Sequence, residues 1–172
     1  MATAYSKIQR NFWETDEARE MTPEEKYFWM YLQTNANVNT LGCYAFRMRK
    51  AMDETGYNRE TLEKLLQRME QVLRILYDEG TKEVFLLHWA EGNWNKKTAN
   101  LRALAADLKE IQSKTLKETV KTLLLKNGIF TEEEVEKAEK TAPSAQERNE
   151  KEQRGTTGNK RSGEGEGEGE GE

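Results

Sequence analysis

The sequence predicts a mainly α fold with a small β-hairpin, namely a winged helix-turn-helix followed by further helices and a disordered tail. Three stretches predict it. Residues 47–73 have the pattern of two helices joined by a tight turn, and residues 75–87 have that of two strands around Asp78-Glu79-Gly80. Residues 143–172 contain almost no side chain that could be buried.

An N-terminal arm, residues 1–21, precedes the first predicted helix. Phe12 and Trp13 stand in acidic sequence that has no periodic pattern. Bulky aromatic residues so near a terminus are usually anchors that tie the arm to the core. We expect both side chains to pack on the core.

The first helix is predicted over residues 23–34. Thr22 can cap it, Pro23 suits its first position, and Glu25 can bond back to the cap, which completes a capping box. After a polar loop, residues 42–46 are expected to be extended and to add a third strand beside the hairpin.

The helix-turn-helix follows. A short helix over residues 47–55 should stop at Gly56, since glycine accepts the left-handed conformation after a helix end. Asn58 can cap the second helix, residues 59–73. Two helices joined by so tight a turn cross steeply, which allows one of them to enter a DNA groove. The second helix has apolar residues at helical spacing: Leu62, Leu65, Leu66, Met69 and Val72.

The C-terminal part is predicted to be helical. Residues 89–98 read as a loop, and apolar periodicity then predicts one helix over about residues 101–111 and another over 114–126, closed by Asn127-Gly128. A capping box at Thr131 begins a short acidic helix that ends near residue 140.

From Pro143 onward the sequence is of low complexity and ends in alternating Gly and Glu, so we expect a disordered tail. The predicted organisation has four parts: an arm (1–21), a winged-helix domain (22–95), a helical extension (96–142) and the tail (143–172).

Several chemistries are disfavoured by the residues present. The chain has one Cys, Cys43, and one His, His88, so an internal disulfide and a zinc cluster are not expected. Cys43 reads as a small hydrophobe and His88 as a packed or hydrogen-bonded structural histidine. The segment Gly92-Asn93-Trp94-Asn95-Lys96-Lys97-Thr98 lacks the glycine that a phosphate-binding loop needs before its lysine. We therefore expect no enzyme activity, cofactor or metal.

Size and hydropathy indicate one modest domain. The chain has 172 residues, of which 34% are charged and 35% are hydrophobic. No apolar run approaches the length of a membrane span, and the N-terminus lacks a signal-peptide core. We expect a soluble cytoplasmic protein.

The net charge of −4 is unevenly distributed. Residues 26–74 carry eight Lys/Arg and five Asp/Glu, and residues 96–126 carry eight and three. Two basic blocks among acidic ones are compatible with a local phosphate-binding face.

The predicted DNA-binding residues lie on the helix-turn-helix and the hairpin. They would contact phosphates or base edges of double-stranded DNA: Arg47, Arg49, Lys50, Arg59, Lys64, Arg68 and Lys82. A second basic stripe is expected along one face of the helix over residues 114–126, where it could also touch DNA: Lys114, Lys117 and Lys121.

The chain resembles a known family over about residues 8–112. The order of motifs is similar to that of the winged-helix domain of DnaD-like replication proteins from phages and prophages of Gram-positive bacteria. The most specific part is the spacing from Tyr31-Leu32 to Gly42. The matching residues are Phe12, Trp13, Asp16, Pro23, Glu25, Lys26, Tyr31, Leu32, Thr34, Asn35, Asn39, Gly42, Tyr44, Glu54, Thr55 and Gly56.

The resemblance implies an oligomeric winged-helix protein that binds origin DNA and helps a replicative helicase or its loader to arrive. Two alternatives remain open. Glu60 and Glu63 share a helix with Lys64, so its surface is mixed in charge and also suits a protein-protein adaptor, in which the hairpin edge, Trp94 and the early aromatics would make the contacts. A winged-helix transcriptional regulator would use the same fold.

Overall fold

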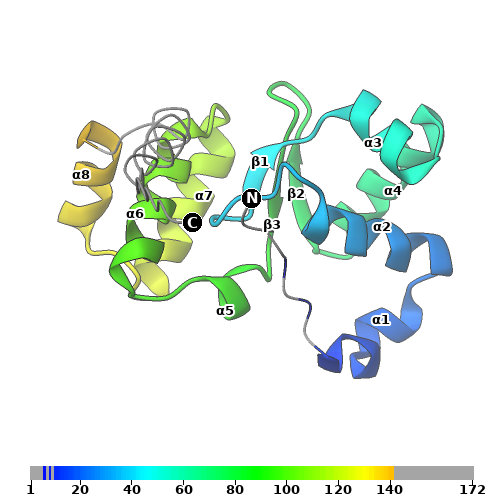
Figure 1. The fold of residues 1–172 in the computed structure, drawn as a ribbon, viewed down its shortest axis with the longest axis horizontal. Helices are drawn as coiled ribbons and strands as arrows, with labels where there is room; N and C mark the ends of the chain where they lie inside the picture. Colours follow the sequence, from blue (N-terminus) through cyan, green and yellow to red (C-terminus); the bar gives the residue numbers. More distant parts are fainter. Residues whose placement is uncertain (1–5, 7, 9, 142–172) are drawn as a thin grey trace, which may run out of the picture.

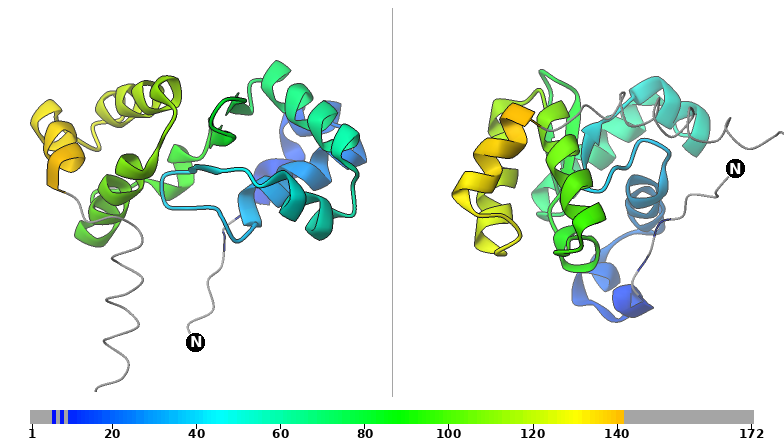
Figure 2. Two further views of the ribbon diagram at one scale, coloured as in Figure 1. Left: turned by 90° about the horizontal axis from the view of Figure 1, so that it is seen from above. Right: turned by 60° about the vertical axis from the view of Figure 1, so that its left-hand side comes forward.

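The sheet at the centre of the molecule has helices on both sides. The computed structural model describes residues 6, 8 and 10–141. The helices within residues 16–71 lie on one side of the three strands and those within residues 98–141 on the other (Figure 1), and the same separation is seen from above (Figure 2).

The winged-helix part follows the order α2, β1, α3, α4, β2, β3. Its elements are α2 (Pro23–Thr34), β1 (Cys43–Ala45), α3 (Met48–Thr55), α4 (Arg59–Gln71), β2 (Ile75–Asp78) and β3 (Glu83–Leu86). The strands form an antiparallel sheet in the order β1-β3-β2, in which Val84 pairs with Tyr44 on one side and Tyr77 on the other. This is the topology of a winged helix, with β2 and β3 as the wing.

The remaining elements flank this part. Before it lie the 3-10 helix η1 (Arg10–Glu14) and α1 (Asp16–Glu20), and after it lie α5 (Ala90–Asn93), α6 (Thr98–Glu110), α7 (Lys114–Lys126) and α8 (Glu132–Thr141). None of the helices that the structure describes is long and apolar enough to span a membrane.

The local signals that predicted the helices are present. Thr22 and Glu25 form the capping box of α2, Asn58 caps α4, and Thr131 with Glu134 makes reciprocal hydrogen bonds at the start of α8. Four of the five positions expected to face inward on α4, Leu62, Leu65, Leu66 and Met69, are buried in the core, whereas Val72 caps the end of the helix and is half-buried. The side chains that are fully buried across the winged-helix part include Phe28, Leu32, Leu62, Met69, Ile75, Val84 and Phe85.

Two carboxylates of the wing bind the beginning of α7. The side chain of Glu83, on β3, accepts hydrogen bonds from the backbone N–H groups of Gln112 at 3.0 Å and Ser113 at 2.7 Å. The Ser113 hydroxyl donates to Asp78 on β2. These N–H groups lie at the N-terminus of a helix, where the helix dipole is positive, so the negative charge of Glu83 interacts favourably with them. The wing and the C-terminal helices are joined at this junction.

Several sequence predictions need correction. Trp13 does not pack on the core, since its side chain is 63% exposed, whereas Phe12 is buried as expected. His88 is not packed either; it is exposed and lies 3.6 Å from Glu91. The predicted loop over residues 89–98 contains the short helix α5, and Trp94 is buried there with its indole N–H donating to the carbonyl of Leu41.

The adaptor alternative uses Trp94 and the early aromatic residues Phe12 and Trp13 as contacts. Of these three side chains only Trp13 is at the surface. The predicted tail, residues 143–172, lies outside the described residues.

Candidate nucleic-acid interface

The predicted helix-turn-helix is formed by α3 and α4. Gly56 ends α3 with a φ of 77°, and its N–H donates to the carbonyl of Met52 at 3.0 Å. Two residues later Asn58 accepts a hydrogen bond from the N–H of Thr61, which begins α4. Ala51 of α3 is fully buried in the same core as the apolar face of α4, so the opposite face of α4 is left at the surface.

A shallow groove of about 170 Å³ separates α4 from the wing. Met48 from the start of α3, Arg59 from the start of α4 and Lys82 from the wing all contribute to its walls. Three of the predicted basic segments therefore meet at this groove. The groove is nevertheless not basic, because three glutamates also line it: Glu63, Glu70 and Glu79.

Two cations of α4 are paired along the helix. Lys64 Nζ lies 2.7 Å from Glu60 Oε1, and Arg59 Nη1 lies 3.6 Å from Glu63 Oε1. The hydrogen bond from Lys64 lowers the pKa of the Glu60 carboxyl. Both pairs are more than half exposed, and water and salt screen such pairs strongly, so an incoming phosphate could replace either glutamate at small cost.

Arg68 is turned toward α2. Its Nε lies 2.9 Å from Glu25 Oε1, while the other oxygen of Glu25 accepts the N–H of Thr22 at 2.8 Å. Helical positions advance about 100° each, so Arg68 lies roughly 180° around α4 from Arg59. Arg68 is thus part of the α2–α4 packing and lies away from the groove. The capping pattern had predicted the bond to Thr22 but not the bridge to Arg68.

The cations of α3 and the wing differ in their surroundings. Arg47 and Arg49 are exposed and make no ion pair with any residue that the structure describes. Lys50 lies 3.7 Å from Glu54, and Lys82 pairs with Glu79 in the wing turn. Of the seven predicted DNA-contacting cations, Arg47 and Arg49 are those whose charge is not offset by a neighbouring carboxylate within the described residues.

The second basic stripe, on α7, is only partly at the surface. Lys114 is exposed and Lys117 is half-buried, whereas the Lys121 side chain is only 18% exposed and lies 2.9 Å from Glu118. Helix α7, which carries the stripe, lies on the other side of the sheet from α4 (Figure 1).

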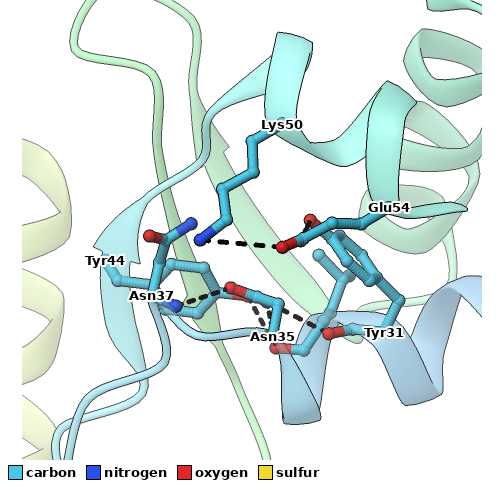
Figure 3. Close-up of polar contacts among 7 residues, drawn as sticks. Tyr31, Asn35, Asn37, Tyr44, Lys50 and Glu54 are labelled. Atoms are coloured by element: carbon cyan, nitrogen blue, oxygen red, sulfur yellow. Dashed lines mark hydrogen bonds and ion pairs between the residues drawn. The ribbon is translucent and has the colours of Figure 1, made fainter.

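The motif residues of the family resemblance form a structural network (Figure 3). The side-chain amide of Asn35 donates to the carbonyls of Tyr31 and Leu32 at the end of α2 and to the Tyr44 hydroxyl, which itself donates to Leu32. The Tyr31 hydroxyl donates a hydrogen bond to Glu54 on α3 at 2.7 Å. Burial of the phenol, and secondly this hydrogen bond, raise the pKa of Tyr31. These residues therefore connect α2 to β1 and α3.

Asn39 and Gly42 shape the turn before β1. The Asn39 side chain accepts the N–H of Gly42 at 2.9 Å and donates to the carbonyl of Cys43. Cys43 is buried, and its burial raises the pKa of the thiol, in agreement with the prediction of a small hydrophobe. The residues in the most specific part of the motif therefore stabilise the fold, and none of their side chains lines the groove.

The fold and the groove together define the class of protein, a winged helix with C-terminal helices. Comparison with protein-family models, with curated proteins and with solved structures finds no match to this chain. The DnaD-like resemblance remains a prediction.

Proposed function

We propose that this chain is a DNA-binding winged-helix protein that acts in replication initiation as a DnaD-like organiser, binding origin duplex and helping a helicase or its loader to arrive. The topology supports this, because α4 and the wing lie side by side in the order α2-β1-α3-α4-β2-β3, and Met48, which stands between Arg47 and Arg49 in the sequence, lines the groove between them. The role is non-enzymatic and needs no cofactor, and we place it in the cytoplasm.

In the proposed mode, the outer face of α4 approaches the major groove and the arginines that precede and begin α3 contact phosphates. Lys64 and Arg59 lie on this face in exposed ion pairs with Glu60 and Glu63, and in the proposed mode they keep these pairs, so the phosphate contacts come from Arg47 and Arg49. Arg68 would act indirectly: its bond to Glu25 fixes the angle between α4 and α2.

The test is fluorescence anisotropy with a short duplex at low and moderate salt. Arg47→Ala with Arg49→Ala should weaken binding by at least about tenfold, because each arginine would lose a charge-assisted contact. Lys117→Ala with Lys121→Ala removes the same charge from α7 and serves as the matched control, with little effect expected. Equal binding by the Arg47/Arg49 variant, or the opposite order of the two variants, would refute this placement.

A second candidate is a protein-protein adaptor with little DNA affinity. It is favoured by the pairing of five of the seven predicted cations with glutamates and by the three glutamates of the groove. Absence of salt-sensitive duplex binding even at low salt, together with retention on a helicase or loader in a pull-down, would favour this candidate.

A further inference from the structure

Two tyrosine rings form a corner at the surface between α2 and the turn that joins α3 to α4. The rings of Tyr27 and Tyr57 meet edge to face, with their centroids 5.8 Å apart and their planes at 73°. Tyr27 is 46% exposed and Tyr57 is half-buried. Within the described part of the chain, neither hydroxyl makes a hydrogen bond and no Lys or Arg lies over either ring. Both rings therefore keep part of their surface for other contacts.

Carboxylates stand at both ends of this corner. Glu24 is one turn before Tyr27 on the same face of α2, and it makes no ion pair with any residue that the structure describes. One turn after Tyr27, the hydroxyl of Tyr31 donates to Glu54 of α3 at 2.7 Å (Figure 3). Partial burial, and then the charge of Glu24 and the neighbouring phenol, raise the pKa of Tyr57. Negative charge is thus close enough to act on the corner.

The charges of α3 are reversed relative to its dipole. Arg47, Arg49 and Lys50 stand at its N-terminal end, and its last turn contains Asp53 and Glu54 but no cation. A helix C-terminus favours cations and disfavours carboxylates, so this arrangement does not serve the stability of the helix. Lys50 lies 3.7 Å from Glu54, whereas Asp53 pairs with no cation among the described residues. A cation bound at the end of α3 would interact favourably with both carboxylates and with the dipole.

We propose that this corner binds a cationic side chain, lysine or arginine, of another protein. The cation would lie against the rings of Tyr27 and Tyr57, because the face of an aromatic ring attracts positive charge, with Glu24 beside it. The adjoining carboxylates and helix C-terminus favour an ammonium or guanidinium group over an apolar one. The site is independent of the proposed DNA binding, since it lies at the opposite end of α3 from Arg47 and Arg49 and its negative charge disfavours phosphate.

The experiment is an NMR titration of the full chain with carbon-13-labelled tyrosine rings, without DNA and at constant ionic strength. The probes are a glycine-lysine-glycine peptide with blocked ends and its arginine equivalent, at up to about 100 mM, since one cation–π contact beside a carboxylate is weak. The norleucine equivalent is the neutral control. Both cationic peptides should shift the signals of Tyr27 and Tyr57 in a saturable way, and the norleucine peptide should not. The peptide that binds more tightly identifies the preferred side chain.

Substitutions at exposed positions separate the cation–π contact from simple apolar packing. Tyr27→Leu keeps an apolar side chain and should weaken binding of the cationic peptides about 3–10-fold, whereas Tyr27→Phe keeps the ring and should leave binding within about twofold. Glu24→Gln should weaken binding about 2–3-fold. Its matched control is Glu132→Gln, which removes the same charge from the first turn of α8 and should leave binding unchanged.

Four results would overturn the proposal. They are the absence of a saturable shift at Tyr27 and Tyr57 with either cationic peptide, an equal response to the norleucine peptide, wild-type binding by Tyr27→Leu, and equal effects of Glu24→Gln and Glu132→Gln. Because no DNA is present, none of these results depends on whether the chain binds a duplex.

Discussion

Gly42 illustrates at the scale of one residue how the turn before β1 is specified. Its φ is 77°, a conformation that favours glycine, and a Cβ built there would lie 2.4 Å from the Trp89 ring. Trp89 in turn donates its indole N–H to the carbonyl of Thr40 at 3.0 Å. Gly56 has the same φ but has no atom within 4 Å of such a Cβ. Gly56 is therefore required only for its backbone conformation, whereas Gly42 is required both for its conformation and for the space beside the Trp89 ring.

We predict that Gly42→Ala lowers the free energy of unfolding by about 3–4 kcal/mol, through the left-handed backbone together with overpacking against Trp89. Gly56→Ala should cost only about 1 kcal/mol, because it meets the backbone penalty alone. Urea unfolding followed by far-UV circular dichroism measures both. Equal losses in the two variants would show that the Trp89 contact gives way without cost.

Asp78 gives stability a dependence on pH. The hydrogen bond from Ser113, and then those from the backbone N–H groups of Thr81 and Gly80, lower the pKa of the Asp78 carboxyl below its usual value near 4. Since the folded-state pKa is depressed, the contribution is present above the unfolded pKa and is lost as the pH falls through the folded value.

Asp78→Asn should therefore reduce stability at pH 7, and its difference from the wild type should shrink as the pH falls below about 4. Urea midpoints at several pH values test this. Asp16→Asn, at a surface carboxylate that is 90% exposed, is the control and should change the midpoint little. A difference that stays constant across the range would contradict the assigned bond.

At the scale of elements, the wing and α7 are coupled through Glu83. This buried carboxylate is placed by β3 at the N-terminus of α7, where it accepts two backbone N–H groups. Glu83 thus joins β3 to the N-terminus of α7, while the turn of the wing, with Glu79 and Lys82, lines the groove beside α4.

Glu83→Gln should destabilise the protein by about 1–3 kcal/mol, since an uncharged amide cannot satisfy both N–H groups as well and adds a buried donor. Hydrogen exchange should quicken most at Ser113 and in the first turn of α7. Glu79→Gln removes an exposed charge from the same wing without touching α7 and is the matched control. Unchanged exchange in α7 would show that the junction is held by other contacts.

At the scale of the whole molecule, the distribution of paired and unpaired charge limits any DNA affinity. The chain carries a net charge of −4, and only Arg47 and Arg49 of the seven predicted cations lack an ion pair among the described residues. Binding that relies on two phosphate contacts should depend on salt far less than binding that relies on six to ten.

We predict that duplex affinity falls about tenfold between 50 and 200 mM salt, since two contacts give a slope of about −1.8 in log K against log salt. The Arg47→Ala variant should reduce the magnitude of this slope by about 0.9. Anisotropy titrations at four salt concentrations measure it. A loss of a thousandfold or more in the wild type would mean that the paired lysines and arginines also release their glutamates and bind phosphate.

The sequence by itself determined most of the elements, but not η1 and α1 in the predicted arm or α5 in the predicted loop. The signals for helix starts, helix ends and the wing turn all act through hydrogen bonds within about four residues, so the local pattern is enough to predict them. They are Thr22, Asn58 and Thr131 at helix starts, Gly56 and Asn127-Gly128 at helix ends, and Gly80 in the wing turn. The apolar spacing of α4 likewise predicted which face is buried and therefore the winged-helix class.

Only the tertiary structure decided which of the predicted surface side chains are exposed, buried or paired. Arg68 is bound to Glu25, 43 residues earlier, Trp94 is buried against Leu41 while Trp13 is exposed, and Glu83 binds α7 some 30 residues later. These outcomes depend on which elements pack together in the folded chain. The pattern of residues within one element does not show which charged or aromatic side chain a distant element will place beside it.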